Sequence, residues 1–287
     1  MILNSETLVG YLRAEFTKAS RLRVWMFFTQ LAVAVPAAIS VVVADEILLY
    51  VLAVLGTVLL ISWWVLNTLY GSARNAAQSA RRAAMLMGGL KDQLSASEIQ
   101  NLRERLTVTA EEAKAFEKKD YYASNLAPSS SRLGEMLEES AFYSAKLQRV
   151  SASTMLAIIL VFALLAGVIA LTAIPMVERD GSMVGTRILL SVLVFIMSSD
   201  VLGALLAHRS SASALDNIRA RLVAADRSRY PQTDVLLIMA DYNAAVESAP
   251  ESVPFAYRLL ESRLNQQWRQ YLADRAEVRK DTEEVSS

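Results

Sequence analysis

Few residues of this chain could carry out chemistry by themselves. The 287-residue sequence has no cysteine and a single histidine, His208. Without cysteine there can be no zinc–thiolate site, disulfide, thiol nucleophile or redox switch. A lone histidine excludes paired-histidine metal motifs and disfavours a Ser–His triad. Walker loops and the G-x-G-x-x-G, H-E-x-x-H and G-x-S-x-G motifs are also missing from the sequence. We therefore expect a protein that is not an enzyme, with no catalytic residues, no metal and no cofactor.

Three glutamates are grouped on one predicted helix. Glu135, Glu138 and Glu139 follow one another at i, i+3 and i+4 spacing, which brings them to one side of a helix. Carboxylates in this arrangement could hold a metal ion or transfer protons. Arg132 and Lys146 flank them, however, and a solvated, ion-paired helix face is the commoner use of such a pattern. We expect that solvated face here.

Asp200 stands alone inside an apolar run of the sequence. Its position is about 10 Å from the end of the run at 1.5 Å per helical residue. An ionisable group at that depth in a membrane is costly unless it faces protein or water. Gln30, Asn67 and Thr154 fall at comparable depths of the other apolar runs. The four residues define a polar inner-leaflet layer. It is either a water-lined path or gate, or a set of polar contacts between helices.

Four long apolar runs must position these polar residues. They cover residues 24–44, 47–73, 150–177 and 188–207, and hydrophobic residues make up 54% of the chain. Soluble domains contain about 45–50% by a similar count. About 20 apolar residues suffice for a helix to cross a bilayer core. The sequence predicts an all-α, polytopic membrane protein with four transmembrane helices in two hairpins.

The basic residues indicate the orientation of these helices. Of the 29 lysines and arginines, 27 lie before the first run, between the second and third, or after the fourth. The two short connections hold only Arg179 and Arg187. Cationic flanks stay on the cytoplasmic side of a membrane. We expect a multi-pass protein of the plasma membrane with both termini in the cytoplasm. The net charge of zero gives no attraction toward nucleic acid.

The segments outside the apolar runs are predicted to be helical. Ser95 with Glu98, and Thr109 with Glu112, are capping boxes that would each start a short helix. No proline interrupts residues 132–174, so one helix is expected to run over 132–176, from the cytoplasm into the third span. Further helices are expected over 234–248, capped by Thr233, and over 255–279. The predicted organisation is a cytoplasmic helix 1–23, a transmembrane hairpin 24–73, a helical insert 74–149, a second hairpin 150–207 and a helical tail 208–287.

Two groups of residues could mediate helix contacts. Small residues at four-residue spacing allow helices to approach closely. They would serve either packing within the chain or formation of a homo-oligomer. These residues are Ser199, Gly203 and Ala207 in the fourth span, and Ala163 and Gly167 in the third. An apolar stripe along the tail helix is either core packing or a partner-binding face. The stripe comprises Phe255, Leu259, Leu264 and Trp268.

The arrangement of paired spans, helical insert and helical tail resembles the SMODS-associated four-transmembrane-helix effectors. The stretch 133–144, Leu-Gly-Glu-Met-Leu-Glu-Glu-Ser-Ala-Phe-Tyr-Ser, and the tail pattern Pro250, Pro254, Tyr257, Leu264, Trp268 carry the local similarity. The resemblance implies a non-enzymatic, pore-forming effector of bacterial antiviral defence at the inner membrane. It also implies activation by a cytoplasmic signalling partner or a nucleotide second messenger. No functional residue of the family can be matched one to one.

We expect a channel or pore-forming protein gated through its cytoplasmic helices. The alternative is a non-conducting scaffold, anchored in the bilayer, that recruits partners through its tail. A small transporter is disfavoured because no internal repeat is evident, and a membrane enzyme because no catalytic motif is present. Asp200 separates the first two hypotheses, since a scaffold has no need of a carboxylate inside the membrane.

Overall fold

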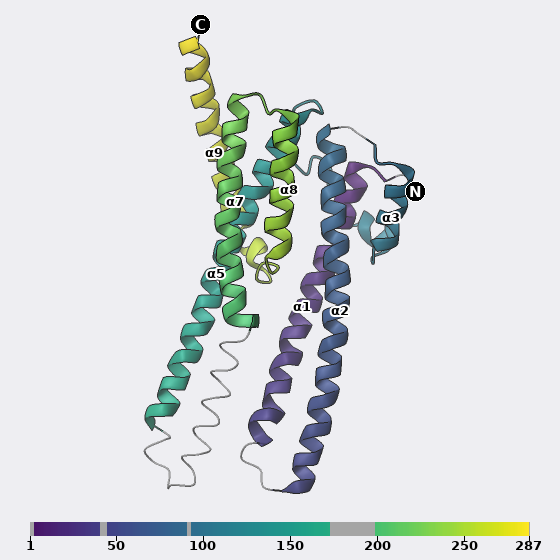
Figure 1. Ribbon diagram of the computed structural model, residues 1–287, viewed down its shortest axis with the longest axis vertical. Coiled ribbons are helices and arrows are strands. Elements are labelled where there is room, and N and C mark those ends of the chain that lie inside the picture. Colours follow the sequence, from purple (N-terminus) through teal and green to yellow (C-terminus); the bar gives the residue numbers. More distant parts are fainter. Residues whose placement is uncertain (1–2, 41–44, 91–92, 173–198, 287) are drawn as a thin grey trace. The chain divides into compact units, whose positions relative to one another are not determined.

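The computed structural model describes residues 3–40, 45–90, 93–172 and 199–286 (Figure 1). All regular secondary structure in these residues is helical, which confirms the predicted all-α class. The described chain divides into two compact units, Met1–Tyr121 with Ser153–Leu206 and Tyr122–Ala152 with Ala207–Ser287. The helices are α1 (Ser5–Ser40), α2 (Glu46–Leu90), α3 (Ala96–Arg105), α4 (Ala110–Lys114), α5 (Ser130–Thr172), α7 (Ala204–Arg227), α8 (Gln232–Ser248) and α9 (Ala256–Ser286), with a π-helical turn at Ser199–Gly203.

The first unit is built on α1 and α2, which lie side by side in opposite directions (Figure 1). Alanines on the second half of α2 leave room for the larger apolar side chains of α1, so the two helices pack closely. The short helices α3 and α4 cover one side of this pair. The core of the unit contains Leu3, Leu8, Val9, Tyr11, Leu12, Ala80, Ala83, Ala84, Leu102 and Ala113.

Both short helices begin at the predicted N-cap residues, and the capping box is complete at α4. The Ser95 hydroxyl accepts a bond from the Glu98 backbone N–H at 3.3 Å. Thr109 and Glu112 form a complete reciprocal capping box. A Cβ added to Gly10 of α1 would lie 2.6 Å from the Ala113 carbonyl oxygen. Only glycine therefore allows α4 to approach α1 so closely.

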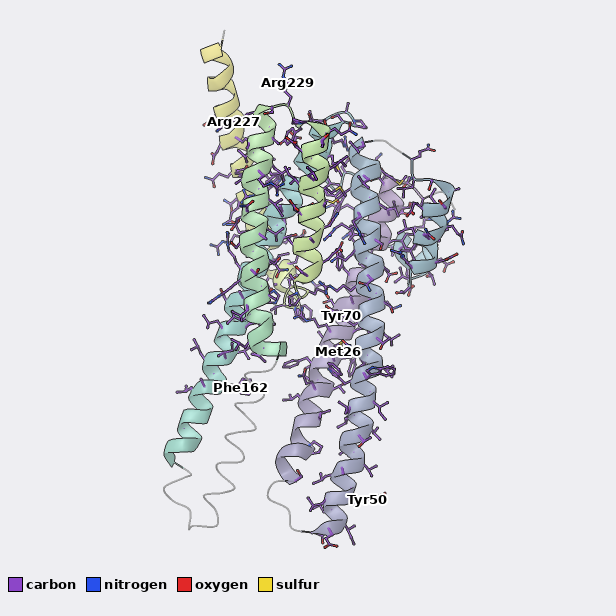
Figure 2. The ribbon with its side chains drawn as sticks, in the orientation of Figure 1. Met26, Tyr50, Tyr70, Phe162, Arg227 and Arg229 are labelled. Atoms are coloured by element: carbon purple, nitrogen blue, oxygen red, sulfur yellow. The ribbon has the colours of Figure 1, made fainter. Side chains whose placement is uncertain are left out.

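The first half of α2 presents large apolar side chains outward. Ile47, Tyr50, Val58, Leu60 and Trp64 are all exposed, whereas buried residues begin at Ala73. A water-soluble monomer rarely leaves so large an apolar surface uncovered. Figure 2 shows Tyr50 near the start of α2, with Tyr70 and Met26 at neighbouring levels of α2 and α1.

Two described helices are long and apolar enough to cross a membrane. They are α2, Glu46–Leu90, and the part of α5 covering Ser130–Leu164. The two predicted spans 47–73 and 150–177 lie in these helices, the latter described as far as Thr172. The predicted span 24–44 lies mainly in α1, which is not among the two. Most of the predicted span 188–207, and its short connection to the third span, lie outside the described residues. Four spans are thus not confirmed.

The second unit packs the first half of α5 with α7, α8 and α9. A bond of 2.7 Å from the Tyr143 hydroxyl to Oδ1 of Asn265 joins α5 to α9. The Ser211 hydroxyl donates to the Ala245 carbonyl at 2.9 Å and joins α7 to α8. The core residues are Leu133, Met136, Leu137, Ala141, Phe142, Ala145, Ala212, Leu215, Ile218, Leu222, Val235, Ile238, Met239, Tyr242, Leu264 and Trp268.

Three of the predicted helix limits can be compared with the structure. The single helix predicted over 132–176 is present as Ser130–Thr172, as far as the chain is described. The cap predicted at Thr233 is wrong, because α8 begins at Gln232, two residues before the predicted start, behind Pro231, whose ring already holds φ near the helical value. The tail helix continues to Ser286, beyond the predicted end at 279. Both α2 and α5 cross the predicted domain limits at 73 and 149 without interruption.

Candidate functional site

Asp200 lies in the π-helical turn that precedes α7. Its side chain is outside the described part of the structure. π-Helical turns are rare and occur often at functional sites, because one extra residue per turn displaces the backbone hydrogen bonds. The irregular backbone therefore includes Asp200, the charged residue of the fourth apolar run.

The other three residues of the predicted polar layer lie on three different helices. Gln30 on α1 and Thr154 on α5 are half-buried, while Asn67 on α2 is exposed among apolar neighbours. An outward-facing Asn67 would meet lipid or another protein helix rather than the inside of its own unit. The layer stays a prediction.

Of the small residues in the predicted packing ridges, the two on α5 have no close neighbour helix among the described residues. Ala163 is exposed, and a Cβ built on Gly167 meets no described atom within 4 Å. Gly203 and Ala207 are half-buried, and the side chain of Ser199 lies outside the described residues. Packing within the chain and oligomer formation both stay open.

The predicted partner-binding stripe divides into two parts. Leu264 and Trp268 are buried. The Trp268 ring lies 5.2 Å from that of Phe142, centroid to centroid, so it packs within the unit and is closed to a partner. The prediction of one continuous partner-binding face over all four residues is therefore wrong. Phe255 and Leu259 are 66% and 81% exposed, and they alone remain available for contact.

A buried charge cluster connects α5, α7 and α9. Glu138 on α5 accepts bonds from the Tyr271 hydroxyl and from Arg275, both on α9. Arg275 also reaches Asp226 on α7 at 2.9 Å and donates to the Tyr230 hydroxyl at 2.8 Å. The solvated face expected for the glutamates is therefore wrong for Glu138, because α9 covers it. No local pattern in the sequence indicates this pair, because Glu138 and Arg275 are 137 residues apart.

The neighbouring glutamates fasten the loop before α5. Glu135 accepts a 2.6 Å bond from the Ser124 hydroxyl, and Glu139 accepts one of 2.8 Å from the Ala123 backbone N–H. Among the residues that the structure describes, no group of three or more histidine, cysteine or acidic side chains is arranged to hold a metal. These carboxylates act as helix and loop connectors.

A cavity of about 80 Å³ opens beside this charge cluster. Trp268 lines it, and the Trp268 Nε1 atom is buried without a hydrogen-bond partner. The remaining lining residues are Ala123, Ser124, Glu135, Glu138, Glu139, Leu272, Arg275 and Ala276. The volume suits a few water molecules rather than an organic substrate.

A second set of contacts lies where α5 becomes apolar. The imidazole Nδ1 of His208, fully buried at the start of the tail, contacts Oε1 of Gln148 on α5. One residue further along α5, Arg149 pairs with Asp216 of α7. These contacts join α7 to α5 immediately before the uncharged run that begins at Val150. These contacts were not predicted from the sequence, because each joins residues at least 60 positions apart in the chain.

Compared with known protein families, curated proteins and solved structures, the chain matches none of them.

Proposed function

We propose that this protein is a bacterial inner-membrane channel or pore-forming effector gated through its cytoplasmic helices. One observation carries the proposal. The helix α5 runs unbroken from Ser130 to Thr172, with its first half in the core of the second unit and an uncharged half on which large apolar side chains such as Leu160 and Leu164 are exposed. A continuous helix transmits a displacement of one end to its other end. A conformational change in the second unit would therefore move the uncharged half of α5, which is the part expected in the membrane.

Two further features support the proposal. Apolar side chains on α5, such as Leu160 and Leu164, are exposed in the same way as those of α2, as expected of surfaces that face lipid. The π-helical turn places irregular backbone at Asp200. Irregular backbone at membrane depth is tolerated where it is buried in protein or lines a water-filled cavity.

A reconstitution experiment separates the pore from the scaffold. The full chain is inserted into sealed vesicles that contain a potassium-sensitive dye and, separately, a larger fluorescent dextran. A channel releases potassium and retains the dextran, whereas a disruptive pore releases both. A non-conducting scaffold leaves both vesicle populations intact, and that result would refute the proposal.

The membrane topology needs its own measurement, because only two spans are supported by the structure. The absence of native cysteine allows single-cysteine labelling at Glu46 and Leu237, both of which are exposed. An impermeant maleimide added to intact spheroplasts should label Glu46→Cys and leave Leu237→Cys unlabelled. The reverse pattern would overturn the predicted orientation.

The scaffold stays the second candidate because of the exposed residues Phe255 and Leu259. Exposed large apolar side chains close together on one helix commonly mark a docking site. If a protein partner covers them, recruitment by the tail would explain the surface without conduction.

A further inference from the structure

The segment 250–254, which leads into α9, is hydrogen-bonded to α5 at residues 148–151, a position that we call the boundary level. Gln148 Nε2 donates to the Pro250 carbonyl at 3.3 Å, and the Val253 backbone N–H donates to the Ser151 hydroxyl at 3.0 Å. Gln148 and Ser151 are both buried, so these bonds are shielded from water. The linker before Phe255 therefore lies beside residues 148–151 of α5.

This level coincides with the ends of two apolar runs. Arg149 is the last charged residue of α5 before the uncharged run, and His208 is the first residue after the fourth apolar run. The contact between His208 and Gln148 places both ends side by side. If the two runs cross a bilayer, its cytoplasmic surface must pass through this level of the second unit.

Phe255 and Leu259 project from this same level into solvent. The Leu259 backbone N–H donates to the Phe255 carbonyl at 3.0 Å, so Phe255 immediately precedes α9 and Leu259 lies in its first turn. Phe255 has φ of 67°, a left-handed conformation that non-glycine residues rarely adopt. No gain from burying the ring offsets this strain, because 66% of Phe255 is exposed.

Among the exposed charges near these two residues, the arginines fit an anionic lipid surface, and the exposed acid Glu261 accepts a bond from the Tyr257 hydroxyl. Arg258, in the same turn of α9, is exposed, and so is Arg209, next to His208 on α7. Bacterial inner leaflets are rich in anionic headgroups, and arginine near such a surface is stabilised electrostatically. An apolar pair flanked by arginine is the pattern of helices that lie in the membrane interface.

We infer that Phe255 and Leu259 are an interfacial anchor, inserted at the boundary between headgroups and acyl chains of the cytoplasmic leaflet. This inference rests on the membrane insertion in the proposed function. It goes further than the proposed function, because it states that lipid covers Phe255 and Leu259 and that the start of α9 is held at the bilayer surface. Because the segment before Phe255 is hydrogen-bonded to α5, the anchor would hold this part of α5 and the start of α9 together at the bilayer surface.

Spin labels on the cysteine-free chain test the anchor. The full chain is reconstituted in nanodiscs of phosphatidylcholine and phosphatidylglycerol, with a nitroxide on Leu259→Cys. The nitroxide collides often with oxygen when it lies in lipid, because oxygen concentrates there, and often with a water-soluble nickel chelate when it lies in water. The two collision rates therefore show which of the two surrounds the label. We expect collisions with the chelate to be several-fold rarer at residue 259 than at the control Leu237→Cys. Phe255→Cys is the second test position.

The control position is chosen to remain in water. Leu237 on α8 is 59% exposed, similar to the test residues. Asp241, one turn further along α8, pairs with Arg221 at 2.5 Å. Arg221 lies about 20 Å along α7 from His208 at 1.5 Å per residue, so Leu237 is remote from the boundary level.

A third label distinguishes failure of the anchor from failure of the membrane assignment. Leu160→Cys on α5 should be the most lipid-like position of all. If residue 160 is in lipid while 255 and 259 are as accessible to the chelate as 237, the anchor is refuted and the proposed function stands. If residue 160 is also in water, both fail. Dipolar broadening between labels at residue 259 would show a second copy of the chain as the occupant and overturn the anchor.

Discussion

Glu138 of α5 and Arg275 of α9 form an ion pair in which 1% and 11% of the side chains are exposed. The pair is completed by Tyr271 on one side and by Asp226 and Tyr230 on the other. Buried charges are tolerated when such bonds replace the lost water. The pair therefore specifies how α9 lies against α5, and it is the contact most sensitive to removal of one partner.

Replacing Arg275 with methionine should destabilise the second unit. The change leaves Glu138 buried without its counter-charge, which costs about 3–5 kcal/mol in comparable pairs. The measurement is urea unfolding of the full chain in detergent. The matched control is Arg221→Met, which breaks the Arg221–Asp241 pair with side chains 43% and 55% exposed. Exposed pairs contribute about 0–1 kcal/mol. Equal losses in the two variants would contradict this account.

Glu15 should hold the α3–α4 connection against α1. Its buried carboxylate accepts bonds from the Thr107 hydroxyl at 2.7 Å and the Val108 N–H at 2.9 Å. Glu15→Ala leaves these donors without an acceptor, at a cost of about 1–3 kcal/mol. Hydrogen exchange of the Val108 amide should accelerate accordingly. Glu6→Ala, at an exposed site of the same helix, should leave that exchange rate unchanged.

The capping box of α4 should weaken in acid. Bonds from the Thr109 backbone N–H, and secondly from its hydroxyl, hold the pKa of Glu112 below its ordinary value of 4.5. The ionised form is favoured in the folded state, so the cap is complete above pH 4.5 and is lost as the pH falls through the lowered pKa. The chemical shift of the Thr109 amide should follow this titration. Glu112→Gln keeps an acceptor but cannot titrate, so an unchanged pH profile in this variant would be contrary to expectation.

Gly134 should not tolerate a methyl group. A Cβ at this position of α5 would lie 2.4 Å from Cδ1 of Tyr230, whose buried ring packs against the glycine. Overpacking of this kind costs about 1–3 kcal/mol. Gly134→Ala should lower the midpoint of thermal unfolding of the second unit. Gly167→Ala on the same helix meets no described atom within 4 Å and serves as the control. A loss of stability only in the control would argue against this packing.

The helices could be predicted because their signals are local. The Thr109–Glu112 capping box and the unbroken run before Pro175 involve neighbouring residues, and α4 and α5 follow them. The residues of each helix that are buried against other helices could not be predicted from local signals. The apolar residues of the tail helix follow one helical repeat along its length. Trp268 nevertheless packs in the core, while Leu259 is exposed. Which part is covered depends on where α5 lies, and that is decided by packing between distant segments.

The charge cluster escaped prediction for a related reason. Glu138 has the local pattern of a surface residue, with cationic neighbours in sequence at Arg132 and Lys146. Its actual partner, Arg275, belongs to a helix near the far end of the chain. Periodicity and charge patterns describe one helix at a time, and a pair between helices becomes visible only when both are placed.

Potassium release from vesicles that contain the wild-type chain, Asp200→Asn or Asp45→Asn shows whether the protein conducts and whether Asp200 contributes to the conducting path. Asp200→Asn removes a carboxylate at the π-helical turn. Asp45→Asn removes one at the start of α2 and keeps an oxygen for the Leu48 N–H. The account predicts release by the wild type and Asp45→Asn, and a clearly altered rate with equal insertion for Asp200→Asn. No release by the wild type, or an identical rate in all three, would contradict it.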